Sequence, residues 1–282
     1  MLDHNGSRQT PMPFSVLISI YHGTLASDME SCLKSLVDQH LQASQIILVR
    51  DGPVRPEVEQ CIASFSSQLP FEHLSFENNR GLGLALRDGL TLCCHELVAR
   101  VDSDDRSMPD RFALQIAFLK ENPAISVVGG WMREHYCSAT QSSVRLRKVP
   151  IDIKTIARYA RRRNPLNHPT VMFRKSHALQ SGGYQSCHLF EDYFLWARML
   201  MDNYRLANLP VVLVDTQIDP TYFERRGGVA YLCHEFRLLK KLKRLGFFSQ
   251  IDAIGFIIIR LPMRLVPVKL RKKLYHSLLR NS

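Results

Sequence analysis

The sequence lacks the marks of a secreted, zinc-stabilised or membrane-spanning chain. Its seven cysteines are odd in number and include no C-x-x-C pair, which argues against a disulfide framework or a zinc site and favours reduced thiols in the cytosol. The first thirteen residues contain no apolar stretch, so we expect no secretory signal there. The longest apolar run near the C-terminus, residues 253–259, is too short to span a bilayer. The 45% hydrophobic and 22% charged composition indicates an ordinary globular protein.

Acidic side chains are scarce in the last fifth of the chain. Residues 225–282 contain 14 lysines and arginines against two acids, whereas residues 1–224 contain 23 basic and 24 acidic side chains. The net charge of +11 therefore belongs to the C-terminal segment. Apolar and basic residues interleave there, which predicts amphipathic helices that bind the anionic inner face of a membrane. The alternative is a helical layer that packs on the body and leaves its charges in solvent.

Apolar runs alternate with helical patterns over the first half of the chain. Five runs predict buried strands, at residues 14–20, 45–49, 71–77, 97–101 and 125–131. Ser107, followed by Pro109, predicts the N-cap of a helix that runs to about Glu121. The alternation predicts an α/β fold with right-handed crossovers and a mostly parallel sheet covered on both faces. We expect the less regular second half to add helices and strands to the same domain.

Polar residues follow three of the predicted strands, at the strand ends where ligands bind in open α/β sheets. They are Asp51, the run 78–81 ("NNRG") and the run 102–105 ("DSDD"). We expect all three to converge on one edge of the sheet. Clustered carboxylates without histidine or cysteine suit a hard cation such as Mg²⁺ or Mn²⁺, completed by substrate phosphates. The alternative is that these acids cap the next helix and pair with Arg106 or Arg111, and a D-x-D triplet alone does not decide between the two.

Six motifs in this order resemble the family 2 glycosyltransferases, which have the GT-A fold. They are "SVLISIYHG", "IILVRDGP", "NNRGLGLALRDGL", "ARVDSDDRSMPDRF", "NHPTVMFRKSHALQSGGY" and "FEDYFLWARML". The resemblance covers residues 14–228, and its specificity lies in the ordered set. It implies inverting transfer of a sugar from a nucleotide sugar, UDP-linked by the same resemblance, to an acceptor hydroxyl in the synthesis of cell-surface polysaccharide or lipopolysaccharide. The acceptor would be a glycan or a lipid-linked glycan, and the enzyme would act in the cytosol or at the inner membrane face.

The resemblance also implies roles for single residues. The backbone at Ser19, Ile20 and Tyr21, with Asp51, would hold uracil and ribose, and Asn79, Arg80 and Gly81 would close over the nucleotide. Asp102, beside Ser103, would contact the ribose or the metal, Asp104 would ligate the divalent metal, and Asp105 would be structural. Asp192, next to Glu191, would be the general base, and Gly183 and Tyr184 would line the acceptor cleft with His168. These residues form the expected donor, metal, catalytic and acceptor sites.

Several of these residues have plainer interpretations. His168 could be a structural hydrogen-bonding residue, Gly183 part of a helix stop, and the pair Glu191–Asp192 the polar face of a helix. Arg225 is either surface charge or, on a loop hinged by glycines, a side chain that closes on the donor diphosphate. "RDGP" at residues 50–53 departs from the common "VDDGS" form of the family, so Arg50 leaves the detail of the base pocket open.

The chain divides by these patterns into three parts. Residues 1–13 would be a flexible N-terminus, 14–224 the glycosyltransferase domain with a donor half (14–131) and an acceptor half (132–224), and 225–282 a basic amphipathic tail. A sugar-phosphate nucleotidyltransferase is the first rival, but "YHGTLASDMES" after the first strand lacks its glycine-rich basic loop. A nucleic-acid-binding protein is the second, and the nearly neutral body argues against it.

Overall fold

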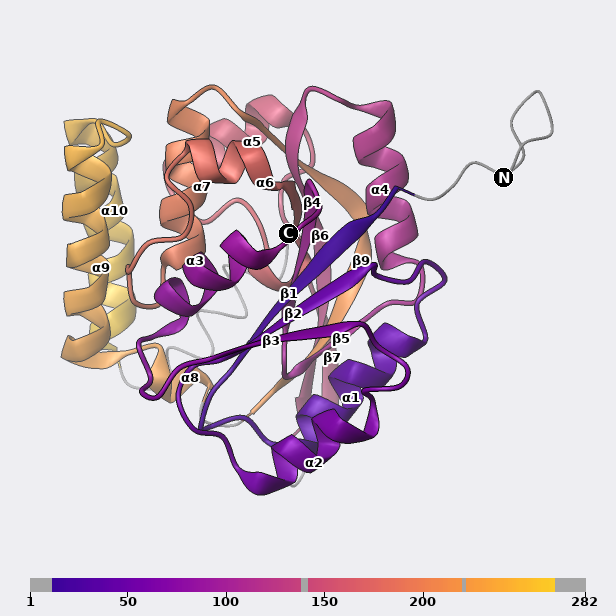
Figure 1. Cartoon of the computed structure of the whole chain (residues 1–282). Helices are drawn as coiled ribbons and strands as arrows, with labels where there is room; N and C mark the ends of the chain where they lie inside the picture. The colour runs from indigo at the N-terminus through magenta and orange to yellow at the C-terminus, as the bar shows by residue number, and fades with distance from the viewer. Residues whose placement is uncertain (1–11, 138–141, 220–221, 267–282) are drawn as a thin grey trace.

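The computed structural model describes residues 12–137, 142–219 and 222–266. Most of the predicted flexible N-terminus and the last sixteen residues of the predicted basic tail therefore lie outside the described residues. Within them, one sheet of nine strands runs through the molecule in the order β3-β2-β1-β4-β8-β6-β9-β5, with β7 beside β6. Figure 1 shows helices on both sides of this sheet.

The first half of the chain forms a parallel sheet, as its sequence pattern predicts. Four strands pair in register with their carboxyl ends on one edge: β1 (Phe14–Ile20), β2 (Gln45–Arg50), β3 (Phe71–Ser75) and β4 (Leu97–Asp102). The connections are helical: α1 (Ala26–Val37), α2 (Pro56–Ser64) and α3 (Leu82–Leu92). Ser19 pairs with Asp102 across β1 and β4, so the ends of these two strands lie side by side.

The second half of the sheet mixes directions. The strands are β5 (Asp105–Ser107), β6 (Ile125–Cys137), β7 (Ser142–Arg147), β8 (Met172–Arg174) and β9 (Arg205–Ile218). Strand β8 runs antiparallel to both β4 and β6, β9 runs parallel to β6, and β5 runs antiparallel to β9. The short β8 thus reverses direction between the parallel half and the two long strands β6 and β9.

The predicted helix start at Ser107 is wrong. Residues 105–107 form β5 and pair with β9, and the helix α4 (Arg111–Glu121) begins four residues later, after Asp110 at the N-cap. Ser107 is buried, and its hydroxyl accepts a hydrogen bond from Arg111 at 3.0 Å. The buried Arg111 side chain bonds to Ser107 and to backbone carbonyls, and it so holds β5 against α4. A local capping pattern does not reveal such contacts between distant residues.

Two apolar layers cover the sheet. One face packs against α1, α2 and α4, and the other packs against α3, α6 (Lys175–Gln180) and α7 (Glu191–Met201). Between β7 and β8 the chain forms α5 (Ile153–Tyr159) and a short 3₁₀ turn, His168–Thr170. The turn and the start of α7 bring the polar residues of the second half to the carboxyl end of β4.

The last helices form a third layer outside α7. They are α8 (Tyr222–Arg225), α9 (Gly228–Arg244) and α10 (Gln250–Leu265), and Figure 1 shows α9 and α10 side by side at one edge of the molecule. Buried aromatic and leucine side chains join α9 and α10 to α7, and buried Glu235 accepts hydrogen bonds from Arg260 and Arg264. The described part of the basic segment is therefore packed on the body. No helix in the described ranges is long and apolar enough to cross a membrane.

Candidate active site

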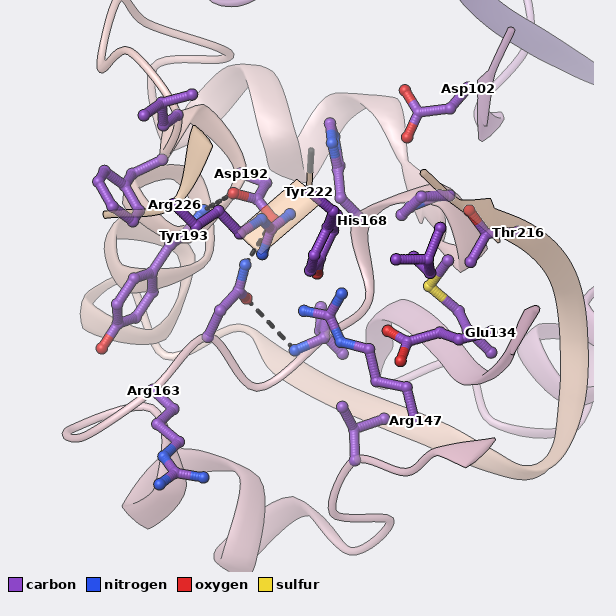
Figure 2. Close-up of a pocket in the computed structure, with 18 of the residues that line it drawn as sticks. Asp102, Glu134, Arg147, Arg163, His168, Asp192, Tyr193, Thr216, Tyr222 and Arg226 are labelled. Carbon is purple, nitrogen blue, oxygen red and sulfur yellow. Dashed lines mark hydrogen bonds between the residues drawn. The ribbon is translucent and has the colours of Figure 1, made fainter. Parts of the chain in front are cut away.

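A cleft of about 610 Å³ opens where β4 ends. Its walls come from strands β4, β5, β6 and β9, from the segment 159–169, from the start of α7 and from the helices α8 to α10. Figure 2 shows labelled side chains from these elements arranged around one cavity, with Asp102 on one side and Arg163 on the other. The strand-end acids of the first half and polar residues of the second half therefore meet in one place.

Asp51 organises the loop beside this cleft. Its carboxylate is buried and accepts hydrogen bonds from the backbone N–H groups of Arg80 at 2.7 Å and Gly81 at 2.9 Å. The side chain of Asn79 donates to the Asp51 carbonyl at 3.0 Å. Gly52 has φ +86°, and a Cβ there would lie 2.8 Å from the Asn79 nitrogen, so only glycine fits. The strand-end residues predicted to hold the nucleotide are thus linked to one another.

Arg50 points away from the cleft. Its guanidinium makes two hydrogen bonds of 2.7 Å with Glu59 on α2 and also contacts His73 on β3. The departure from the common family pattern at this position therefore places a charge against Glu59 on α2, outside the lining of the cleft. Of the other predicted nucleotide contacts, Tyr21 is exposed after β1, whereas the Ile20 side chain is buried in the core and can contribute only its backbone.

Asp102, Asp104 and Asp105 all line the cleft. Burial and repulsion by Asp104 raise the pKa of Asp105 well above its usual value, and its carboxylate accepts a hydrogen bond from Thr216. Loss of water contact and repulsion by Asp102 raise the pKa of Asp104 to about 6. Asp104 still has an exposed surface in the cleft. A cation bound there would relieve the repulsion between Asp102 and Asp104 that contributes to the raised pKa.

Two buried arginines, Arg100 and Arg111, lie near this cluster. Arg100 is fully buried on β4 and donates a hydrogen bond from Nη2 to Asp102. Its Nε and Nη1 have no hydrogen-bond partner among the described residues. Arg111 is also buried, but its guanidinium is directed at carbonyls and at Ser107. Its charge still attracts Asp105 and Asp102, so two guanidinium groups lie near three carboxylates and this end of the cleft is the more acidic one.

The donor set fits a divalent cation only in part. In the described ranges, no group of three or more His, Cys, Asp or Glu side chains is placed to hold a metal by itself. Two carboxylates, Asp102 and Asp104, are accessible from the cleft, whereas Asp105 is buried on β5. Mg²⁺ is commonly held by one or two carboxylates, with phosphate oxygens and water completing its shell. The cluster therefore suits a cation that arrives with a phosphate-bearing ligand.

Glu191 and Asp192 occupy the first turn of α7, where the helix dipole favours negative charge. Asp192 lines the cleft and accepts hydrogen bonds from the Asn164 side chain and, at 2.7 Å, from the Tyr193 backbone N–H. Glu191 is buried, and burial raises its pKa to about 7. Asp192 therefore presents an oriented carboxylate to the cleft, and Glu191 supports the turn behind it.

Of the three predicted acceptor residues, the structure places His168 in the cleft and Gly183 and Tyr184 outside it. His168 lines the cleft, and its Nε2 lies 2.9 Å from the Tyr184 hydroxyl. Burial lowers the pKa of His168 to about 4, so the ring is neutral at physiological pH. Tyr184 and Gly183 are buried and do not line the cleft, and the Gly183 carbonyl accepts a 2.6 Å hydrogen bond from Arg198. Tyr184 therefore contacts His168 from outside the cleft, whereas Gly183 is bonded to Arg198 on α7.

Arg225 lies at the rim on α8. Its exposed guanidinium forms an ion pair with Asp219, and both residues line the cleft. Gly228, three residues later, has φ +80° and begins α9. A glycine in the left-handed region at the start of a helix is consistent with a hinge, although Arg225 here is directed at Asp219.

Sequence reasoning missed part of the cleft wall. Glu134 on β6 is buried and accepts a 2.7 Å hydrogen bond from the Tyr136 hydroxyl, and Asn164 holds Asp192. Three arginines, Arg147, Arg162 and Arg163, also line the cleft. The run "RYARRR" at residues 158–163 contains two of them, but a basic run alone is typical of a solvated surface.

The chain matches the family model described as "Glycosyl transferase family 2" over residues 15–183. It is 37% identical over 267 residues to the amylovoran biosynthesis glycosyltransferase AmsE of Erwinia amylovora, covering 94% of this chain and 98% of that protein. It is 33% identical over 274 residues to the UDP-Gal:alpha-D-GlcNAc-diphosphoundecaprenol beta-1,3-galactosyltransferase of Escherichia coli, covering 97% and 98%.

A solved structure shares the fold at lower sequence identity. The mannosyltransferase PcManGT of Pyrobaculum calidifontis, in complex with GDP-Man and Mn²⁺, superposes with a TM-score of 0.64 and 13% identity. The match covers 95% of this chain and 78% of that one. At that identity the likeness concerns the fold alone, and it agrees with the GT-A architecture expected from the six motifs.

Proposed function

The chain belongs to glycosyl transferase family 2, and from that membership we propose that it moves a sugar, with inversion, from a UDP-sugar to a hydroxyl of a lipid-linked glycan during cell-surface glycan synthesis. Two relatives that align with it almost end to end are bacterial glycosyltransferases, and one of them is named for amylovoran biosynthesis. The observation that carries the proposal is the single cleft in which the Asp102–Asp104 end of β4 faces Asp192 at the start of α7.

The acidic end would bind the donor diphosphate through a divalent cation, Mg²⁺ or Mn²⁺. Asp104 and Asp102 would hold the cation, which when bound neutralises the charge that develops on the departing diphosphate. Support comes from the two carboxylates that share this end, because limited contact with water and repulsion by Asp102 raise the pKa of Asp104 to about 6. Arg100 would keep Asp102 oriented, and the Asp51 loop would shape the wall beside the nucleotide.

Asp192 would act as the general base. Inverting transfer needs a carboxylate that removes the acceptor proton while the hydroxyl attacks C1 from the face opposite the leaving diphosphate. Two hydrogen bonds fix the carboxylate of Asp192, and neutral His168 lines the same cleft as a donor or acceptor for sugar hydroxyls. Asn164 would be the positioning residue, since it contacts Asp192 from the segment that precedes the 3₁₀ turn.

A membrane-proximal acceptor is supported by the outer surface of the last two helices. Ile251, Ile254 and Ile258 recur at helical spacing on α10 and are 81%, 57% and 66% exposed. The exposed face of the neighbouring α9 carries basic side chains, namely Arg237, Lys240, Lys243 and Arg244. An apolar row beside a basic row suits an anionic membrane surface. The named activity of one relative on a diphosphoundecaprenol-linked sugar agrees with such an acceptor.

The proposal is tested by donor hydrolysis and transfer. We expect purified protein to release UDP from one member of a UDP-sugar panel when Mn²⁺ or Mg²⁺ is present and to lose that turnover in EDTA. Restoration by Mn²⁺ but not by Ca²⁺ or Na⁺ would tie the loss to the cation. Failure to bind or turn over any UDP-, GDP- or dTDP-sugar with either metal would refute the proposed reaction.

Membrane association has its own test. We expect the protein to sediment with vesicles that contain anionic lipid at low salt and to be released at high salt, since about 1 kcal/mol per basic residue near the surface is screened by salt. A variant with Ile251, Ile254 and Ile258 changed to serine should stay in the supernatant, whereas Leu114→Ser, at an exposed leucine on α4, should sediment normally. Equal recovery with and without vesicles would contradict the proposal.

A further inference from the structure

Three arginines form what we call the basic end of the cleft: Arg147, Arg162 and Arg163. Arg147 closes β7, and the other two follow α5. None of their guanidinium groups has a hydrogen-bond or ion-pair partner within the part of the chain that the structure describes. Figure 2 shows Arg163 on the side of the cavity away from Asp102, and the Arg147 side chain extending toward the middle of the cavity, beside Glu134 in this view. Positive charge thus gathers in the cleft with no carboxylate bonded to it among the described residues.

Within the described ranges, other arginines that line the cleft are paired with carboxylates of the chain, unlike the three of the basic end. Arg260 and Arg264 also line the cleft, but both donate to buried Glu235. Arg225 pairs with Asp219. The guanidinium groups of the basic end are therefore not bonded to carboxylates of the described chain, and their N–H donors are available to a ligand. Arginine presents a planar fork of donors that matches phosphate oxygens, so a phosphate-bearing ligand would use these groups well.

Sheet topology separates this end from the donor end. The nucleotide loop follows β2 and β3, and the acidic cluster follows β4. Across the sheet, Asp105 on β5 pairs with Thr216 on β9, Thr216 pairs with Glu134 on β6, and Glu134 pairs with Arg145 on β7. At about 4.8 Å between neighbouring strands, β7 is about three strand spacings from Asp105 along this path. The basic end is therefore placed for an anionic group other than a diphosphate bound at Asp104.

Resting on the proposed function, we propose that the basic end binds the diphosphate of the acceptor, a glycan linked through diphosphate to a lipid. The acceptor sugar would lie between the two ends, at Asp192 and His168. Its lipid would extend from the cleft along the surface of α10. Ile259 lines the cleft and directly follows Ile258, the last of the exposed isoleucines Ile251, Ile254 and Ile258. The cleft would then bind two diphosphates, one through a cation and one through guanidinium groups.

The experiment measures binding of farnesyl diphosphate by calorimetry with saturating UDP and Mn²⁺, so that the donor end is already filled. We expect wild-type protein to bind it alongside UDP. The double variant Arg162→Gln/Arg163→Gln should bind it about tenfold more weakly or worse, since charged hydrogen bonds are lost, with the affinity for UDP unchanged. Arg147→Gln, tested alone, should weaken binding in the same direction.

The matched control is Lys154→Gln/Arg158→Gln, which removes the same charge from exposed positions on α5 that do not line the cleft. It should bind farnesyl diphosphate within about twofold of wild type, which excludes a general effect of net charge. Farnesol should bind weakly, and inorganic diphosphate should bind more weakly than farnesyl diphosphate. Equal affinity for inorganic diphosphate would indicate a site for a free anion and overturn the lipid acceptor.

Two further results would overturn the inference. One is displacement of UDP by farnesyl diphosphate, which would assign the arginines to the donor. The other is wild-type affinity in all the arginine variants. Hydrolysis of a UDP-sugar by the same preparations separates this failure from that of the proposed function. Donor turnover with normal binding of farnesyl diphosphate by the variants refutes the basic end alone, whereas absence of any donor binding refutes the reaction.

Discussion

The two ends of the cleft carry opposite charge and are built in opposite ways. At the acidic end, Asp102, Asp104 and Asp105 come from one short stretch of chain at the end of a parallel strand and are supported by buried Arg100. At the basic end, Arg147, Arg162 and Arg163 come from an edge strand and a turn. The acidic end has more carboxylates than buried guanidinium groups, and the arginines of the basic end are not bonded to carboxylates of the described chain, so each end suits a ligand of a particular sign. Asp192 lies in the same cleft and belongs to neither end.

The largest effect should come from the residue between the ends. Asp192→Asn keeps the hydrogen-bonding shape but removes the base, so kcat should fall by about 10²–10⁴ while the affinity for UDP and Mn²⁺ stays unchanged. Asp202→Asn, at the exposed far end of the same helix, is the control and should retain full turnover. Steady-state rates together with UDP titrations measure both. Wild-type kcat in Asp192→Asn would assign the base elsewhere.

The acidic end was largely predictable from sequence, and the basic end was not. Asp51, Asn79, Asp102 and Asp104 follow strands whose apolar runs are visible in the chain, and parallel strands bring their carboxyl ends to one edge. Family resemblance added Asp192, which no local pattern placed near them. The reversal at β8 and the pairing of β5 with β9 depend on contacts between distant residues, so Arg147 and Glu134 could not be assigned to the cleft beforehand.

The second prediction concerns the buried neighbour of the base. Burial raises the pKa of Glu191 from 4.5 to about 7, so the folded protein binds a proton there that the unfolded chain has already released. Glu191 should therefore lower stability by about 3 kcal/mol as pH rises from about 5 to 8. Glu191→Gln should remove this contribution and leave the part of the slope that comes from other acids. Urea unfolding of wild type and variant at the two pH values measures the difference.

The control for that slope is Glu57→Gln, at an exposed acid in the first turn of α2, which should unfold with the same pH dependence as wild type. If Glu191→Gln kept the full slope, the pH dependence would have to come from other buried acids, with Asp105 the first to examine because burial and Asp104 also raise its pKa.

The third prediction tests the need of the acidic end for a cation. Because the pKa of Asp104 is about 6, protons compete with metal below that pH. The affinity for Mn²⁺ in the presence of UDP should be constant above pH 7 and should weaken about tenfold per pH unit below 6. Asp104→Asn should bind Mn²⁺ weakly at every pH, whereas Asp110→Asn, at an exposed acid before α4, should behave as wild type. An affinity independent of pH would argue that Asp104 is no ligand.

The smallest effect should come from Arg50, whose departure from the common family pattern left the detail of the base pocket open in the sequence. The structure pairs it with Glu59, a partner that is 43% exposed, so Arg50→Ala should lower the free energy of unfolding by about 1 kcal/mol or less. UDP affinity should stay within about twofold of wild type, because the guanidinium bonds to Glu59 on α2 and lies outside the lining of the cleft. Calorimetric UDP titration of Arg50→Ala and Glu59→Gln decides the matter. A loss of UDP affinity in Arg50→Ala alone would place the side chain in the donor end after all.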